Sequence, residues 1–156
     1  MDDPKRISFS EKLDEWARQH FDIDPTITDV VHLNRIGTME CRHEDACSLY
    51  LRLWQPSFGD IDGHWPANTL VIASIEFANT RAGHGRALLE FLVPQAELYG
   101  YDKIALEQTH DGDGIQGFVK KFGFEHAWPT LERPQRNWIA SVGRIAERLD
   151  QTVMSS

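Results

Sequence analysis

Two glycines separated by one residue stand where the chain passes from an apolar run into a helical pattern. Gly83 and Gly85 flank His84. Backbone N–H groups at a helix start and the positive end of the helix dipole attract an anion, and glycine lets a phosphate approach the backbone. The pattern therefore predicts a phosphate-binding turn, to which Arg81 and Arg86 would add charge-assisted hydrogen bonds. A tight strand-to-helix turn that binds nothing would use the same glycines, and the spacing alone leaves both interpretations open.

The elements on either side of this turn follow from the spacing of apolar residues. The segment 69–77 is a near-continuous apolar and β-branched run, the pattern of a central strand covered on both faces. A helical pattern follows the turn, and Pro94 within it predicts either a kink or an early end, because proline removes a backbone hydrogen bond. A strand at 103–108, a turn at 111–114 and a short helix that ends at Gly123 come next.

The two ends of the chain carry further elements. Ser8 and Glu11 have the spacing of a capping box, which predicts a first helix from Phe9 to His20. Three strands are expected before the central strand, and the long loop 55–68 is the best candidate for a lid. The expected ranges are 26–33, 38–42 and 47–54 for these strands, 124–131 for a last strand and 136–153 for a C-terminal amphipathic helix.

Length and charge narrow the class of protein. The 156 residues suit a single domain, 1–156. The chain has 16 Lys plus Arg against 24 Asp plus Glu, a net charge of -8, which argues against binding to nucleic acid and slightly favours a cationic partner, although acidity is also a common route to solubility. The two cysteines and the lack of a basic and apolar leader predict a cytoplasmic protein, and no apolar run approaches the roughly 20 residues that cross a membrane.

A short cluster of sulfur and nitrogen ligands is the one candidate for a metal. Cys41, His43 and Cys47 have the look of half a zinc site. Structural zinc takes four ligands, and no second pair is spaced to complete the set, so we expect no metal. The two cysteines are better read as small apolar residues that flank a hairpin.

From the central strand onward, the order of parts resembles the GNAT superfamily of N-acetyltransferases. The acetyl-CoA signature of that family is an Arg or Gln, two residues, a Gly, any residue, then Gly or Ala, and Gly83 and Gly85 match its glycines. Thr80 stands at the Arg or Gln position, with Arg81 beside it. The segment 118–124 is similar to a second family motif, Phe-Tyr-x-Lys-x-Gly-Phe, except for a valine in place of the tyrosine.

The resemblance covers 69–125, the expected cofactor-binding core, and implies an α/β (α+β) fold. In this GNAT-like fold a mixed, mostly antiparallel central sheet is flanked by helices, here with an extra C-terminal helix that would replace the strand pair usually closing the sheet. That helix would cap the domain or pair two copies in a homodimer. In the family the tyrosine is thought to protonate the leaving CoA thiolate, so Val119 implies that a water or another residue does so here.

The implied activity is transfer of an acetyl group from acetyl-CoA to an amine, by direct attack and without a metal. The acceptor would be a small cationic molecule or a protein lysine or N-terminus. A backbone N–H near Phe77 or Ala78 would polarise the thioester oxygen. The implied cofactor-binding residues are Phe77, Ala78, Arg81, Ala82, Gly83, His84, Gly85, Arg86 and Ala87.

The acceptor amine must be neutral to attack, so the implied mechanism needs a general base. Glu76 is the first candidate because it lies near the carboxyl end of the central strand, where burial would raise the pKa of a carboxyl group. Glu107 and His110 are the others. For both carboxylates the alternatives are exposure to solvent or pairing with a neighbouring arginine.

A second hypothesis comes from another class of function. The chain could be a GNAT-fold protein of low or no activity that binds a protein partner, of the kind that phages and other mobile elements encode. The valine at position 119 motivates this alternative, and Trp54, Trp65 and Trp138 would be its exposed anchors. In the enzyme hypothesis, His64 and Trp65 of the long loop would instead shape the acceptor pocket.

Overall fold

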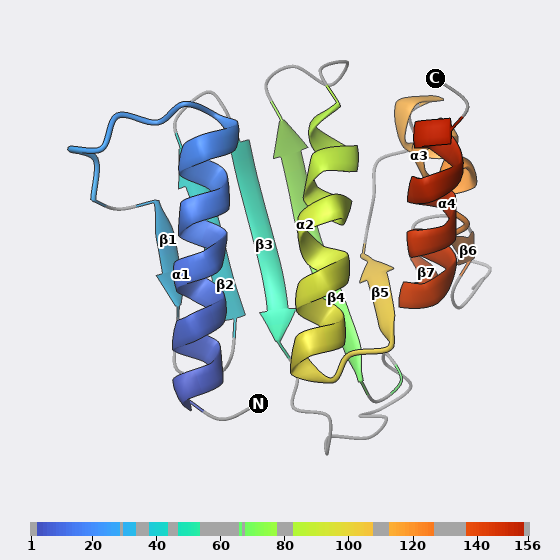
Figure 1. The fold of residues 1–156 in the computed structure, drawn as a ribbon, viewed down its shortest axis with the longest axis horizontal. Helices are drawn as coiled ribbons and strands as arrows, with labels where there is room; N and C mark the ends of the chain where they lie inside the picture. The colour runs from blue at the N-terminus through green and yellow to red at the C-terminus, as the bar shows by residue number, and fades with distance from the viewer. Residues whose placement is uncertain are drawn as a thin grey trace.

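The computed structural model describes residues 3–28, 30–33, 38–43, 47–53, 66, 68–77, 83–107, 113–126 and 137–154. These residues form one seven-stranded sheet and four helices (Figure 1). The helices are α1 (Asp3–His20), α2 (His84–Tyr99), α3 (Asp113–Lys121) and α4 (Val142–Met154). The strands are β1 (Val31–Leu33), β2 (Thr38–His43), β3 (Cys47–Leu53), β4 (Thr69–Phe77), β5 (Lys103–Leu106), β6 (Glu125–His126) and β7 (Trp138–Ser141).

The sheet has the strand order β1-β2-β3-β4-β5-β7-β6. Only β4 and β5 run parallel, and every other neighbouring pair is antiparallel. The connection from β4 to β5 runs through α2, as a parallel pair requires. The predicted fold class, a mixed and mostly antiparallel central sheet flanked by helices with a C-terminal helix, is confirmed.

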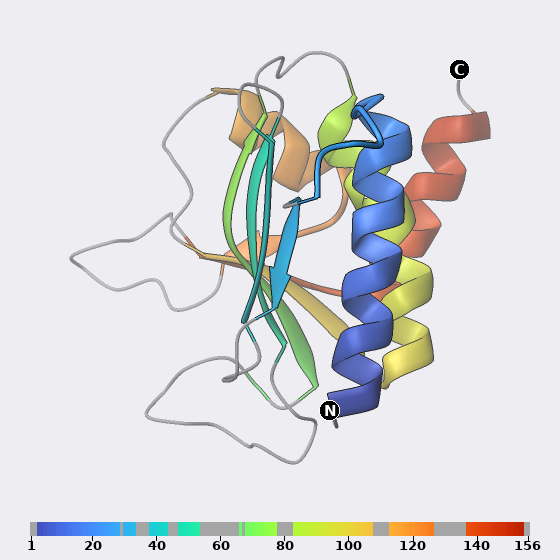
Figure 2. The same ribbon diagram turned by 90° about the vertical axis from the view of Figure 1, so that its left-hand side faces the viewer.

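Three helices cover one face of the sheet. In Figure 1, α1, α2 and α4 lie side by side in front of the strands, and Figure 2 shows all three on the same side of the sheet. On α1, Phe9, Leu13 and Ala17 recur every four residues and are fully buried, because that spacing places them on one face of the helix. They pack with the apolar face of α2 and with the inward-facing residues of the strands, such as Leu49 and Leu51.

The first helix begins earlier than the capping-box pattern predicts. α1 starts at Asp3 rather than at Phe9, and Pro4 is accommodated in its first turn, where a missing N–H costs nothing. Ser8 is therefore inside the helix, and its hydroxyl is hydrogen-bonded to the Tyr99 hydroxyl of α2 at 2.8 Å. The predicted cap is wrong because Ser8 joins two helices instead of starting one.

Pro94 does not end the helix that contains it. α2 continues to Tyr99, so the predicted alternative of an early end at Pro94 is wrong. Gly100 closes the helix with a positive φ of 86°, and its N–H donates to the Ala96 carbonyl. A proline inside a helix costs about 3 kcal/mol, whereas one fully buried leucine contributes about 1.5–3 kcal/mol, and this helix buries several apolar side chains on both sides of the proline. The buried residues are Leu88, Leu89, Leu92, Val93, Ala96 and Tyr99.

The C-terminal region departs most from its prediction. The expected helix at 136–153 begins only at Val142, and the residues before it form β7, which pairs with both β5 and β6. The expectation that the helix replaces the closing strand pair is therefore wrong. Trp138 and Ala140 are buried and alternate with less buried neighbours, as in a strand. Ser141 caps α4, since its hydroxyl accepts a hydrogen bond from the Arg144 N–H at 3.1 Å.

Other boundaries also differ. The predicted strand 26–33 is reduced to β1, because the Asp24 carboxylate accepts hydrogen bonds from the N–H and hydroxyl of Thr26 at 2.9 Å and holds a turn there. Asp113 and Gly114 belong to α3, not to a turn. Apart from residues 66 and 68, the candidate lid 55–68 lies outside the described residues, as do Trp54, His64 and Trp65. No described helix combines the length and the apolar character needed to cross a bilayer.

Candidate functional site

The central strand β4 separates from its parallel neighbour β5 before the chain reaches the turn that contains Gly83 and Gly85, called the glycine turn below. Pairing between β4 and β5 ends at Ile72 and Leu106, and the Glu107 N–H donates to the Ile72 carbonyl at 3.0 Å just beyond it. β4 continues to Phe77, and along this last part the register gives it a partner only in β3. One edge of β4 therefore has no strand partner among the described residues, at the end of the strand that leads to α2.

A β-bulge lies at the point of separation. Tyr50 of β3 is opposite Ser74, whereas the next residue, Leu51, is opposite Ile72. Ala73 is therefore the extra residue on β4. A bulge bends its strand and increases the local twist, which accounts for the divergence of β4 from β5.

The first turn of α2 begins without a side-chain cap. Gly83 is the N-cap residue, with the left-handed φ of 77° that glycine adopts without strain, and it has no side-chain cap. No acidic residue lies in this turn. The first hydrogen bond of the helix runs from the Ala87 N–H to the Gly83 carbonyl at 3.0 Å, so the N–H groups of residues 84–86 have no acceptor within the helix. Such a turn suits an anion.

The second glycine of the turn has a packing role. A Cβ atom at Gly85 would lie 2.7 Å from Cε2 and 3.2 Å from Cδ2 of Phe118 on α3. The ring of Phe118 in turn packs against Phe122, with centroids 5.0 Å apart. The missing Cβ at position 85 therefore lets α3 approach the start of α2, a reason for glycine that is independent of any ligand.

Arg86 is engaged with two protein partners. Its Nε atom is 2.6 Å from Oε1 of Glu90, and its Nη2 donates to the Leu149 carbonyl of α4 at 3.1 Å. The guanidinium thus joins the first turn of α2 to α4. A phosphate contact by Arg86 stays a prediction, and it would have to compete with these two contacts.

Several predicted site residues lie wholly or partly outside the described part of the chain. Glu76 and Phe77 are the last two residues of β4, and Glu76 is opposite Ser48 of β3, but their side chains are not described. Their roles stay predictions. The predicted residues that are not described at all are Ala78, Arg81, Ala82 and His110.

Glu107 is held by an arginine from a neighbouring strand. Its Oε2 atom is 2.7 Å from Nη1 of Arg52 on β3, and the Glu107 side chain is only 17% exposed. Arg52 is opposite Val71 on β4, in a row that continues through Ala105 and Ile139. Val71 and Ala105 are fully buried but form a cluster separate from the main core.

The Arg52 and Glu107 pair allows the structural and chemical roles of Glu107 to be separated. We expect Arg52→Glu and Glu107→Arg each to lower the free energy of unfolding by about 1 kcal/mol, because like charges then meet at a partly exposed site. The double exchange should restore most of that loss, as measured by urea denaturation. If Glu107 is the base of the acetyl transfer that the sequence resemblance implies, the exchanged protein should recover its stability but not that activity. A double variant as unstable as the sum of the singles would contradict the ion pair.

Val119, which stands where the motif that 118–124 resembles has a tyrosine, is fully buried in the main core. It therefore leaves no group that could hold a proton at this position. The helix ends just beyond it, where Gly123 has a φ of 81° and the Phe124 N–H donates to the Val119 carbonyl at 2.9 Å. The predicted terminator at Gly123 is confirmed.

Two residues next to the glycine turn were missed by the sequence analysis. His20, the last residue of α1, faces His84 with 2.8 Å between Nε2 and Nδ1. Phe118 fills the space beside Gly85. Both lie far from the turn along the chain, so no local pattern could place them there. The one available signal was the spacing of Trp16 and His20, which puts two aromatic rings on the same face of a helix.

No protein-family model matches the chain. No curated protein matches it in sequence. Among solved structures, it is similar to an acetyltransferase of the GNAT family from Staphylococcus aureus Mu50, with 13% identity, a TM-score of 0.48, and 91% of this chain and 96% of that one covered. It is also similar to the ribosomal-protein-S18-alanine N-acetyltransferase of Escherichia coli, with 14% identity, a TM-score of 0.44, and 91% and 90% covered.

Proposed function

We propose that the chain is an N-acetyltransferase that moves an acetyl group from acetyl-CoA to an amine. The observation that carries this proposal is the first turn of α2, which has no side-chain cap and belongs to the next element after the strand that separates from β5. The backbone N–H groups of this turn, together with the positive end of the helix dipole, fit a diphosphate. The edge of β4 without a strand partner fits an extended chain that carries amide groups, because such a chain pairs with a sheet edge through backbone hydrogen bonds.

Acetyl-CoA would supply the activated acetyl group, and the residues of this chain would orient it and manage protons. The N–H groups of residues 84–86 would hold the diphosphate, and a backbone N–H near Phe77 or Ala78 would polarise the thioester oxygen. Glu76 is the proposed acceptor of the amine proton, with Glu107 and His110 as alternatives. Since Val119 is buried in the core, solvent would protonate the departing thiolate.

The proposed acceptor is a small cationic molecule or a protein lysine or N-terminus, which agrees with the net charge of -8. Trp138 is one of the three tryptophans that the hypothesis of an inactive, partner-binding protein expects on the surface. It is only 5% exposed and belongs to the main core, so it cannot be an exposed anchor. A cytoplasmic location stays part of this proposal.

A pair of variants at Gly83 tests the cofactor site without disturbing the fold. A Cβ at Gly83 would have no atom within 4 Å, and Asn and Asp are the residues that best tolerate its positive φ. Gly83→Asp places a negative charge at the helix start, whereas Gly83→Asn has the same shape and no charge. We expect micromolar binding of acetyl-CoA by the wild type, near -8 kcal/mol, and at least about tenfold weaker binding by the Asp than by the Asn variant in calorimetric titration.

A loss of binding can be told from a loss of folding, because both variants should keep the wild-type melting temperature within a few degrees. Absence of acetyl-CoA binding by the folded wild type would overturn the proposed function. Equal affinities of the two variants would show that the diphosphate does not bind at the first turn of α2. If the wild type binds as expected, a screen of amines for acetyl transfer identifies the acceptor.

A further inference from the structure

A pair of histidines joins the end of α1 to the start of α2. His20 Nε2 and His84 Nδ1 are 2.8 Å apart, and the two rings are nearly perpendicular, at 87°. Trp16 stacks on His20 with centroids 5.1 Å apart, and Phe21 contacts both imidazoles. The pair lies at the same first turn of α2 whose backbone N–H groups face no acceptor within the helix.

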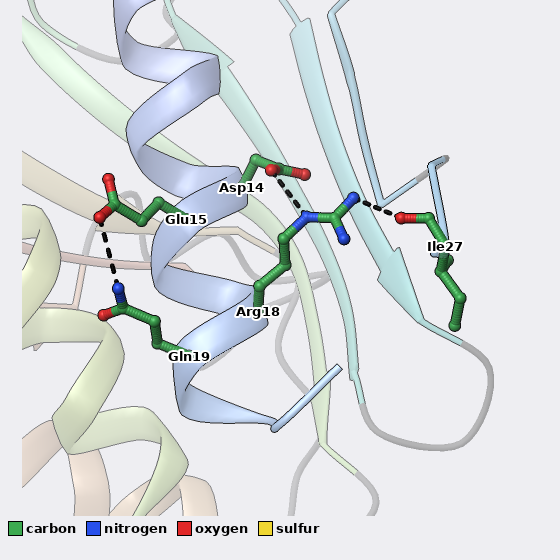
Figure 3. A network of polar contacts seen from close by, with 5 residues as sticks. All are labelled: Asp14, Glu15, Arg18, Gln19 and Ile27. Carbon is green, nitrogen blue, oxygen red and sulfur yellow. Dashed lines mark hydrogen bonds and ion pairs between the residues drawn. The ribbon is translucent and has the colours of Figure 1, made fainter. Parts of the chain in front are cut away.

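The last turn of α1 holds His20 in place. Nε of Arg18 is 2.8 Å from Oδ2 of Asp14, and its Nη2 donates to the Ile27 carbonyl at 2.5 Å (Figure 3). The bond to Ile27 fastens the end of α1 to the segment before β1, and the contact with Asp14 orients the guanidinium for it. His20 is thus presented to α2 from a backbone that is fixed on the side away from the site.

The short distance between the two nitrogens limits how many protons the pair can hold. In the neutral pair, one nitrogen donates its hydrogen and the other accepts it. One extra proton on an outer nitrogen keeps this bond and makes it charge-assisted. A second extra proton would place two N–H groups face to face at 2.8 Å and would break the contact. The pair therefore accepts a single additional proton.

The environment of His20 disfavours its charged form in the absence of a ligand. The pKa of His20 is lowered, mainly by the burial of the ring and to a smaller extent by the charge of His84. The contacting rings of Trp16 and Phe21 do not titrate. Each of the two helices also carries an ion pair near this end, Arg18 with Asp14 on α1 and Arg86 with Glu90 on α2.

We propose that binding of a diphosphate at the first turn of α2 is coupled to the uptake of one proton by the His20 and His84 pair. This inference rests on the proposed function, and it adds a pH dependence and a positioning residue, His20, to that site. The extra charge belongs on His20, because His20 lies at the negative end of the α1 dipole and His84 at the positive end of the α2 dipole.

The sign of the effect follows from linkage. A bound diphosphate stabilises the charged pair, so the complex holds more protons than the free protein. The affinity is then highest at low pH and falls as the pH rises through the pKa of the pair in the complex. Because a single proton is involved, the fall can reach about tenfold per pH unit and no more.

Dephospho-CoA is the probe, because its diphosphate is a diester that does not titrate near neutral pH. Calorimetric titrations from about pH 5.5 to about pH 8, in buffers of different ionisation enthalpy, measure the affinity and the number of protons taken up. We expect the wild type to take up a fraction of one proton. His20→Gln, whose amide can still donate to His84, should bind without proton uptake and with little change in affinity across this range.

A matched variant removes a histidine that lies elsewhere. His32 is exposed on β1, and His32→Gln should keep the wild-type proton uptake. Wild-type binding without proton uptake would overturn this inference and leave the proposed function standing. Proton uptake that survives in His20→Gln would also overturn it. A wild type that binds neither dephospho-CoA nor acetyl-CoA at any pH would overturn both proposals.

Discussion

Phe9→Ala should destabilise the protein by about 3–5 kcal/mol, the largest effect that we expect of a single substitution outside the proposed site. Phe9 is fully buried, and its ring packs against Phe91 at 6.2 Å and Tyr99 at 5.5 Å between centroids. Alanine would leave a cavity between α1 and α2 that neither helix can close without losing its other contacts. The melting temperature should fall on the order of 10 °C, as followed by circular dichroism.

The control for this prediction is on the same helix. Ile7 is 50% exposed, and Ile7→Ala should change the free energy of unfolding by no more than about 0.5 kcal/mol. Equal effects of the two substitutions would show that α1 does not pack on α2 as described. Because α1 carries His20, an undocked α1 would also remove the contact with His84, and the proton uptake described above should then be lost together with the stability.

The central part of the fold could be predicted because each of its elements carries a complete local signal. β4 has the predicted bounds, 69–77, since a near-continuous apolar run is needed where Val71 is buried on one face of the sheet and Leu70 and Ile72 on the other. The terminators Gly100 and Gly123 both have the positive φ that ends a helix. For these elements the local sequence pattern and the tertiary structure favour the same conformation.

The C-terminal region could not be predicted from periodicity because its signal fits two structures. Trp138 precedes Val142 by four residues, so it continues the helical pattern of Val142, Ile145 and Leu149. It is equally the first buried residue of β7, and only pairing with β5, far away in the sequence, decides between the two. The cap at Ser141 was the local clue that the helix starts later.

The glycine turn shows how far the site could be predicted. The left-handed conformation of Gly83 and the donors of the first turn follow from local sequence, since the two glycines stand at the start of the helical pattern. The partners of the turn do not follow, because Phe118 and His20 reach it from α3 and α1 through tertiary packing. The sequence therefore explains what the turn could bind, and the structure explains what already surrounds it.

Gly85→Val tests which of these two causes requires glycine at this position. The ring of Phe118 occupies the place of the new side chain, with its Cε2 atom 2.7 Å from the position of a Cβ, so we expect a loss of stability of about 1–3 kcal/mol from overpacking. In the Phe118→Ala background the ring is absent, and the same substitution should cost little. A double-mutant cycle in urea denaturation should thus give a favourable coupling of about 1 kcal/mol or more.

The same four proteins separate packing from ligand binding. If glycine is needed only for Phe118, then Gly85→Val in the Phe118→Ala background should bind acetyl-CoA as well as Phe118→Ala alone. If the diphosphate also approaches the backbone at Gly85, the double variant should be folded and yet bind at least about tenfold more weakly, because a branched side chain then stands between the ligand and the N–H groups. A coupling energy near zero would contradict the contact itself, and would mean that α3 does not pack on the first turn of α2.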